Sequence, residues 1–574
     1  MLTSSSRKST SQNLEAAKAL ESKIEDIAIR LTAQMQGLQT GLQVIFDAGA
    51  LEDDANNQSL RAWRLTDPRD DRKRIENDKD PLLEGSCAWI FNDPAFTRWW
   101  DDDDCRVLWI HGDPGKGKTM MTMAIIDEIS RRLELSPDSR TLAYFFCQST
   151  IPDLSNANAI VRGLTFLLCS QKPDLGRYLW KKYGETGDRL FEGANSLYSI
   201  WGTLVELLQD AAVHRHYLMI DALDECDAKS METFLRLLNQ EVPRLSTVKW
   251  VLTSRNEQRI TEHLQHAQKS RDTSLELNSI NVERTVQSFI DFKMDILKSR
   301  KEYDNKLDAY VRRHLKENAD GTFLWVSLVC KELERVQARK AREACSRFPA
   351  GLVPLYQRMM EQIEQGDNVE ELKQVLRTIT VACRPLDLSE MGVIAGLSEG
   401  LSSEGQDWQN IRDLISSCRS FLTAREQTVD FVHKSAKDYF TEGEGSRIFP
   451  DGQSFVHCEF SSRLLGIMSD SLRKDICRIG TWGTTLELVD KNAIYRYFPR
   501  YLQYACCFWV EHVHKGQYRL EDNGRVHVFL QKYFLYWLEA LSLIKRVVDA
   551  IPVLVDLQRL LKVNNHCFCY QCTS

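Results

Sequence analysis

One octapeptide, GDPGKGKT at residues 112–119, constrains the fold more than any other feature of the sequence. It matches the pattern G-x-x-x-x-G-K-[ST], follows the apolar run CRVLWIH and precedes the helical run MMTMAIIDEISRRL. This strand–loop–helix context is typical of loops whose backbone N–H groups curl around a phosphate. The octapeptide therefore predicts a phosphate-binding loop between a buried parallel strand and a helix.

The loop carries the residue types needed to bind a nucleoside triphosphate. Its glycines let the backbone approach the β-phosphate, Lys118 neutralises β- and γ-phosphate oxygens, and the Thr119 hydroxyl ligates Mg²⁺. The motif does not distinguish adenine from guanine, so ATP and GTP remain alternatives. The predicted nucleotide-binding residues of the loop are Gly112, Asp113, Pro114, Gly115, Lys116, Gly117, Lys118 and Thr119.

A second motif, LMIDALDEC at residues 218–226, supplies the acids that such a loop requires. Asp221 ends an apolar run and is predicted to hold Mg²⁺ together with Thr119. Glu225 is predicted to polarise the attacking water, and Asp224 is the alternative for that catalytic role. The competing interpretation is an acidic loop after a core strand.

A third run, KWVLTSR at residues 249–255, ends in polar and cationic groups. At the carboxyl edge of a parallel sheet, Arg255 would lie where it could sense a γ-phosphate. A solvated arginine at a strand end is the alternative.

Short apolar runs alternate with helical segments over residues 61–280, which is typical of an α/β domain with a parallel sheet. The apolar run TLAYFFC lies between the octapeptide and the acidic motif in the sequence. It favours a RecA/ASCE-like P-loop NTPase, in which an additional strand lies in the sheet between the strand before the octapeptide and the strand that ends in the acidic motif. A helical, charged stretch follows, then helices with two short strands around FLTAREQTVDFVH, then an aromatic helical remainder. The five predicted strands lie at residues 105–112, 141–147, 216–221, 249–254 and 274–280.

The N-terminal segment carries apolar residues mostly three and four positions apart over residues 17–45, which predicts one amphipathic helix. This helix either binds a protein partner or packs on its own domain. The predicted divisions are an N-terminal helix at 1–60, a nucleotide-binding domain at 61–280, a helical domain at 281–348, a winged-helix domain at 349–445 and a C-terminal helical region at 446–574.

Composition excludes several other classes of protein. The net charge of −7 provides no basic excess for nucleic acid. The 16 cysteines show no repeated spacing and the first residues contain no apolar signal core, which indicates a reduced, cytoplasmic protein. No apolar stretch reaches the ~18–20 residues of a membrane-spanning helix.

Taken in order, GDPGKGKT, LMIDALDEC and VLTSR resemble a NACHT domain, the NTPase module of the STAND/NLR-like signalling class. LTDPRDD, LLEGSCAWIFNDPAFTRWW, ADGTFLWVSLVCKEL and FVHKSAKDYF resemble fungal NACHT proteins of the heterokaryon-incompatibility type. The resemblance covers residues 65–560. It implies a closed form that holds ADP and an open, oligomeric form that holds ATP or GTP.

The resemblance also implies that His433 of the winged helix reaches the nucleotide in the closed form. The sequence departs from the family pattern in two ways. Relatives often carry Asp after this histidine, whereas this sequence has Lys434. Relatives also commonly carry C-terminal repeats of WD, ankyrin or tetratricopeptide type, and none follows residue 561. The expected protein is a slow NTPase that acts as a switch in fungal self/non-self recognition or programmed cell death, with itself or a partner of the N-terminal helix as the binding partner. A constitutively active NTPase and a truncated nucleotide-binding remnant are the alternatives.

Overall fold

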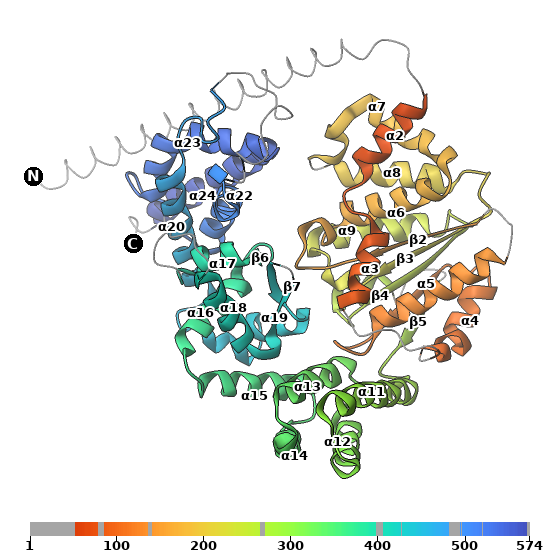
Figure 1. The fold of residues 1–574 in the computed structure, drawn as a ribbon. Coiled ribbons are helices and arrows are strands. Elements are labelled where there is room, and N and C mark those ends of the chain that lie inside the picture. The colour runs from red at the N-terminus through yellow and green to blue at the C-terminus, as the bar shows by residue number, and fades with distance from the viewer. Residues whose placement is uncertain are drawn as a thin grey trace, which may run out of the picture.

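The computed structural model describes residues 52–570, except 79–84, 86, 136–139, 194, 265–269, 398–405, 426, 481–493, 495 and 519. The predicted amphipathic helix at 17–45 lies outside the described residues. Figure 1 shows a sheet and its helices on one side, the green helices α11 to α14 at the base, and the winged-helix and C-terminal helices on the other side. The chain therefore returns toward its nucleotide-binding domain after passing through the helical domain.

A five-stranded sheet forms the centre of the nucleotide-binding domain, in the order β2-β3-β4-β1-β5. All of its neighbouring strands are parallel, and β4 lies between the strand before the octapeptide and the strand that ends in the acidic motif. This order confirms the predicted RecA/ASCE-like P-loop NTPase fold. The strands are β1 (Val107–His111), β2 (Arg140–Phe146), β3 (Arg215–Asp221), β4 (Val248–Ser254) and β5 (Ser270–Ser274).

Helices cover both faces of this sheet, which is why its central strands are buried and mostly apolar. Every residue of β1 and β4 is buried. Along β1, Leu108 and Ile110 join the core that contains α5, whereas Val107 and Trp109 join the core that contains α6, α8 and α9. The helices of this domain are α2 (Glu52–Trp63), α3 (Pro68–Asp78), α4 (Pro94–Asp101), α5 (Lys118–Glu134), α6 (Ala157–Gln171), α7 (Gly176–Thr186), α8 (Ser196–Leu208), α9 (Ala228–Glu241) and α10 (Gln258–Leu264).

The predicted strand at residues 274–280 is wrong. The fifth strand is the polar segment β5, SRDTS, and helix α11 already begins at Ser279. Because β5 is an edge strand whose first three residues are half-buried or exposed, it needs no apolar run. The apolar residues that suggested a strand are divided: Leu275 enters the core, whereas Leu277 and Ile280 are 89% and 66% exposed.

The helical domain connects the sheet to a small antiparallel sheet of order β6-β8-β7. The sequence of helix, strand, two helices and two strands from α16 to β8 is that of a winged helix, and its hairpin confirms the two predicted short strands. The two-residue β6 was missed, because so short a strand has no periodicity to detect. The elements are α11 (Ser279–Lys301), α12 (Asn305–Asn318), α13 (Phe323–Arg335), α14 (Ala338–Ser346), α15 (Leu352–Glu364), α16 (Val369–Val381), β6 (Leu386–Asp387), α17 (Leu388–Ala395), α18 (Gln406–Ser417), β7 (Leu422–Arg425), β8 (Thr428–Phe431) and α19 (Lys434–Thr441).

The described C-terminal region is helical, as predicted. Its helices are α20 (Gln453–Ser471), α22 (Arg500–Lys515), α23 (Arg525–Leu543) and α24 (Ala550–Tyr570). None of the helices in the described part of the chain is long and apolar enough to cross a membrane.

A buried pair of histidines joins α20 to α22 in this region. Nδ1 of His457 lies 2.9 Å from Nδ1 of His512, and the Tyr504 hydroxyl lies 3.0 Å from Nε2 of His512. Burial lowers the pKa of His457 to about 4 and lowers the pKa of His512 well below its ordinary value. Lys515 lowers both pKa values further, and Glu511 opposes this for His457.

We expect this pair to make the protein less stable in weak acid. Between pH 6.5 and about 4 the unfolded chain binds protons at His457 that the folded chain excludes, so the free energy of unfolding falls as pH falls, by at most about 1.4 kcal/mol per pH unit and histidine. Melting temperatures at pH 7 and pH 5 measure the effect. His457→Gln should reduce this difference, because the amide can still donate to His512 but does not titrate. An unchanged difference would show that the pair does not carry the acid sensitivity.

A candidate nucleotide site at the carboxyl edge of the sheet

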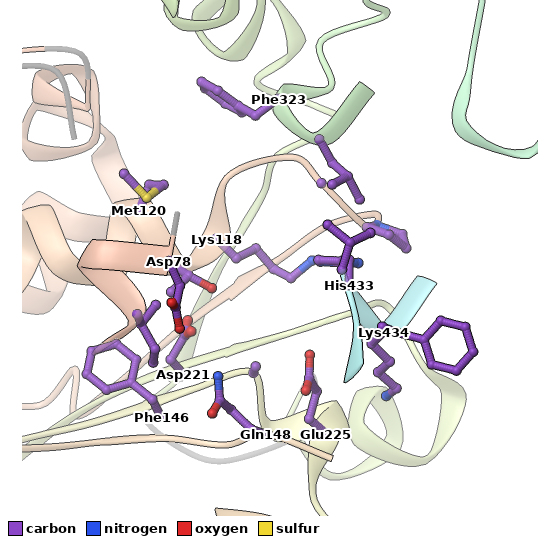
Figure 2. A pocket seen from close by; sticks show the side chains of 18 of the residues that line it. Asp78, Lys118, Met120, Phe146, Gln148, Asp221, Glu225, Phe323, His433 and Lys434 are labelled. Carbon is purple, nitrogen blue, oxygen red and sulfur yellow. The ribbon is translucent and has the colours of Figure 1, made fainter. Parts of the chain in front are cut away.

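A cavity of about 950 Å³ lies at the carboxyl ends of β1, β3 and β4. The phosphate loop, helices α3, α11 and α13, and the winged helix all contribute to its walls (Figure 2). Parts of the chain that are more than 300 residues apart in sequence, such as Arg74 and His433, therefore line one site. Of the predicted site residues, the lining includes Pro114, Gly115, Gly117, Lys118, Thr119, Asp221, Asp224, Glu225, Arg255 and His433.

The shape of the phosphate loop depends on two glycines. Gly115 and Gly117 have φ angles of +78° and +92°, a region that side-chain-bearing residues rarely adopt. A Cβ atom on Gly115 would lie 2.8 Å from Cβ of Leu324, and one on Gly117 would lie 2.8 Å from Cε2 of Phe323. The start of α13 therefore packs directly against the loop.

Three predicted loop residues lie away from the cavity lining. The backbone N–H of Asp113 donates to Glu276 at 2.7 Å, and the N–H of Gly112 donates to the carbonyl of Ser254 at 3.3 Å. The Lys116 ammonium donates to the carbonyl of Asp320 in the helical domain at 2.5 Å. These contacts anchor the base of the loop and its outer side.

Lys118 is the lysine of the phosphate loop that lines the cavity. Its Nζ donates to the carbonyls of Gly112 and Asp113 at 2.5 and 3.0 Å, and no carboxylate of the described residues forms an ion pair with it. Burial lowers the pKa of this ammonium, and the charge of Asp224 opposes that shift. A half-buried ammonium whose hydrogen bonds among the described residues go to neutral carbonyls fits a phosphate, because phosphate oxygens offer it stronger, charge-assisted bonds.

Asp221 is held by two threonines that the sequence motifs did not identify. Oδ1 of Asp221 accepts from the hydroxyls of Thr122 and Thr253 at 2.8 and 2.6 Å, and the carboxylate is buried. Thr122 lies three residues after Thr119 on α5, so both face the same side of the helix. Thr253 interrupts the apolar run of β4, and this polar residue within a buried strand was the signal in the sequence that could have identified it. This orientation fits a carboxylate that holds Mg²⁺ together with Thr119.

The two acids after Asp221 lie in different surroundings. Ala222 has a φ of +54°, which turns the chain sharply after β3. Oε2 of Glu225 accepts from the backbone N–H of Ser149 at 3.0 Å and lies at the cavity wall (Figure 2). Asp224 is buried and forms ion pairs with Arg255 and Lys434 at 3.2 and 3.3 Å. Of the two, Glu225 lies in the surroundings that suit a water-activating base.

Arg255 and His433 connect the site to the winged helix. Nη1 of Arg255 donates to Asp438 on α19 at 2.5 Å. His433 is the N-cap of α19, where its Nδ1 accepts from the backbone N–H of Ser435 at 3.1 Å. Figure 2 shows Lys118 and His433 among the side chains that line the same cavity. The structure therefore brings both residues to the site and gives each of them an identified contact with the winged helix.

The strand order, the glycine loop and the acid at the end of β3 define a P-loop NTPase, a class that binds a nucleoside phosphate with Mg²⁺. A family model described as "Nephrocystin 3, N-terminal" matches residues 85–255. The vegetative incompatibility protein HET-E-1 of Podospora anserina is 36% identical over 527 residues, which cover 88% of this chain and 38% of that protein. The chain belongs to the NACHT proteins of the fungal heterokaryon-incompatibility type. It spans less than half the length of that relative.

The solved structures to which the chain is similar are more distant in sequence. The Walker-type ATPase PABY2304 of Pyrococcus abyssi is 10% identical, with a TM-score of 0.31 over 66% of this chain and 98% of that chain. The Aeropyrum pernix ORC2 protein is 14% identical, with a TM-score of 0.31 over 68% of this chain and 98% of that chain. The strand order of the sheet, rather than these likenesses, defines the fold.

Proposed function

We propose that the chain is a nucleotide-dependent switch that is closed with a diphosphate and opens to form an oligomer with a triphosphate. The observation that carries the proposal is the composition of the cavity wall, to which the phosphate loop, the helical domain and the winged helix all contribute. A change at the phosphate end of the nucleotide therefore acts on the contacts that hold these parts together. A ligand that binds two arrangements differently shifts the balance between them.

The packing of α13 on the phosphate loop supports this coupling. The backbone N–H of Phe323 donates to the carbonyl of Gly115 at 2.9 Å, at the start of α13. At the other end of the helix, Glu332 accepts from the hydroxyl of Ser420 in the winged helix at 2.9 Å. One helix thus contacts the phosphate loop and the winged helix, so a movement of the loop is transmitted through a rigid element.

The relative's name places that protein in vegetative incompatibility, and we propose the same type of signalling for this chain. ATP or GTP would be the triphosphate, the cytoplasm the compartment, and the predicted N-terminal helix the element that recruits a protein partner. A constitutively active NTPase is the second candidate function. Lys118, Asp221 and Glu225 line the same cavity, an arrangement that suits hydrolysis in a switch and in a constitutively active enzyme.

One experiment separates the two functions. We expect the purified protein to be a monomer by light scattering, to release a diphosphate when denatured, and to turn over at or below about one per minute without an activator. Steady turnover at roughly 1–100 per second with either ATP or GTP would instead indicate a constitutively active enzyme.

Glu225→Gln is expected to bind triphosphate normally and hydrolyse it at least about tenfold more slowly, which corresponds to about 1.4 kcal/mol in the barrier. The carboxylate is lost but Gln can still accept from the Ser149 N–H, so the local structure should persist. Single-turnover hydrolysis and fluorescent-nucleotide titration measure the two effects. If Asp224→Asn shows this behaviour and Glu225→Gln does not, the roles of the two acids are exchanged.

A further inference from the structure

Four charged side chains alternate in sign where the winged helix meets the nucleotide-binding domain. They run in the order Lys434, Asp224, Arg255 and Asp438. Asp224 and Arg255 belong to the nucleotide-binding domain, whereas Lys434 and Asp438 lie four residues apart on α19. Residues at this spacing lie on one face of a helix. We call these four residues the α19 charge cluster.

The contacts within the α19 charge cluster are short and largely excluded from water. Nζ of Lys434 donates to the main-chain carbonyl of Asp224 at 2.6 Å and lies 3.3 Å from its carboxylate. The side chains of Asp224 and Lys434 are 3% and 16% exposed. Ion pairs at such sites are screened by salt much less than surface pairs. Removing one partner leaves the other charge poorly compensated.

The α19 charge cluster occupies Arg255, the predicted γ-phosphate sensor, and Asp224, the alternative to Glu225 as the catalytic acid. Asp224 is one of the acids that follow β3, and both of its cationic neighbours neutralise it. Arg255 stands at the end of β4, but it binds Asp224 and Asp438, while its Nη2 is buried without a hydrogen-bond partner among the described residues. Burial lowers the pKa of Arg255, but the charges of Asp438 and Asp224 outweigh burial and raise it. The arginine therefore stays charged in the cluster.

We propose that Lys434 and Asp438 are positioning residues that withhold Asp224 and Arg255 from the nucleotide while the winged helix is closed. Because both lie on α19, one movement of that helix releases both groups together. Lys434, which stands where relatives often have Asp, then acts on the nucleotide-binding domain instead of on the phosphate. This inference rests on the proposed switch and names how the same site is regulated.

The test compares variants of α19 with a matched surface lysine. Lys434→Gln and Asp438→Asn remove one charge each, Lys434→Arg retains the cation, and Lys340→Gln removes an exposed lysine of α14. We expect Lys434→Gln and Asp438→Asn to raise kcat about tenfold with ATP or GTP and Mg²⁺, with little change in KM. Lys434→Arg and Lys340→Gln should remain within about twofold of wild type.

A purely structural role would change the melting temperature but would not raise kcat. An unchanged or lower kcat in both Lys434→Gln and Asp438→Asn, with folding confirmed by circular dichroism, would overturn the proposal. An increase in Lys340→Gln equal to that in Lys434→Gln would overturn it as well, because it would show that loss of any lysine has the same effect.

A second measurement separates this proposal from the proposed function. Small-angle scattering gives the radius of gyration of each variant without nucleotide and of wild type with ADP or a non-hydrolysable triphosphate. Equal values for wild type with the two nucleotides would contradict the switch. The measurements without nucleotide test the α19 charge cluster. We expect a larger radius of gyration for Lys434→Gln than for wild type and Lys434→Arg. Equal radii would overturn the proposed role of the cluster.

Discussion

Lys118→Ala is expected to abolish triphosphate binding, with a loss of affinity of about 10- to 150-fold or more, while the circular dichroism spectrum stays nearly unchanged. Removing a hydrogen-bonded cation from an ionised partner costs about 1.5–3 kcal/mol, and no backbone group can replace it. The structure gives the reason to expect an intact fold: among the described residues, the Lys118 ammonium donates only to two carbonyls of its own loop. A fluorescent-nucleotide titration measures the loss, and affinity within about threefold of wild type would contradict the phosphate site.

Lys116→Ala provides the comparison within the same loop. Its ammonium donates to the carbonyl of Asp320 and does not line the cavity. We therefore expect a much smaller loss of affinity than for Lys118→Ala. Equal losses in the two variants would mean that the loop's total charge, and not the position of Lys118, determines binding.

The fold of the nucleotide-binding domain could be predicted because its signals are local. The glycine loop, the apolar strands before it and the acid at the end of β3 each lie within a few consecutive residues. Strand β5 could not be found in this way, since an edge strand made of SRDTS shows neither an apolar run nor alternation. The buried residue Leu275 lies just after β5, and its hydrophobic side chain led to the prediction of a strand at residues 274–280 instead.

Sequence motifs predicted residues of the candidate site but not the contacts that those residues make with other domains. Sequence placed Arg255 at the edge of the sheet, but its contact with Asp438 joins residues 183 positions apart and depends on how the winged helix folds back. Thr122 shows the same limit, because a threonine within a helix is common and only the position of Asp221 gives this one a role. Physical contacts between domains therefore add the information that motifs lack.

His433 offers a test of mechanism because its side chain has one observed role, as the N-cap of α19, and one proposed role, as a contact of the nucleotide. As N-cap of α19 its Nδ1 accepts from the N–H of Ser435, so the neutral ring carries its proton on Nε2. An Nε2–H at a cavity wall can donate to a diphosphate oxygen, as the resemblance to switch proteins implies. In the proposed switch, capping would stabilise the helix in both forms of the protein, whereas a contact with a diphosphate would belong to the closed form alone.

His433→Ala and His433→Asn separate these two roles. Asn is a good N-cap residue but is shorter than His, so it should preserve α19 and lose the nucleotide contact. If the contact is worth about 1.5–3 kcal/mol, both variants should release diphosphate about 10- to 150-fold faster and show a smaller rise in melting temperature on addition of ADP. Only His433→Ala should also melt earlier without nucleotide. An ADP-induced shift equal in wild type and both variants would mean that this histidine caps α19 and does not sense the nucleotide.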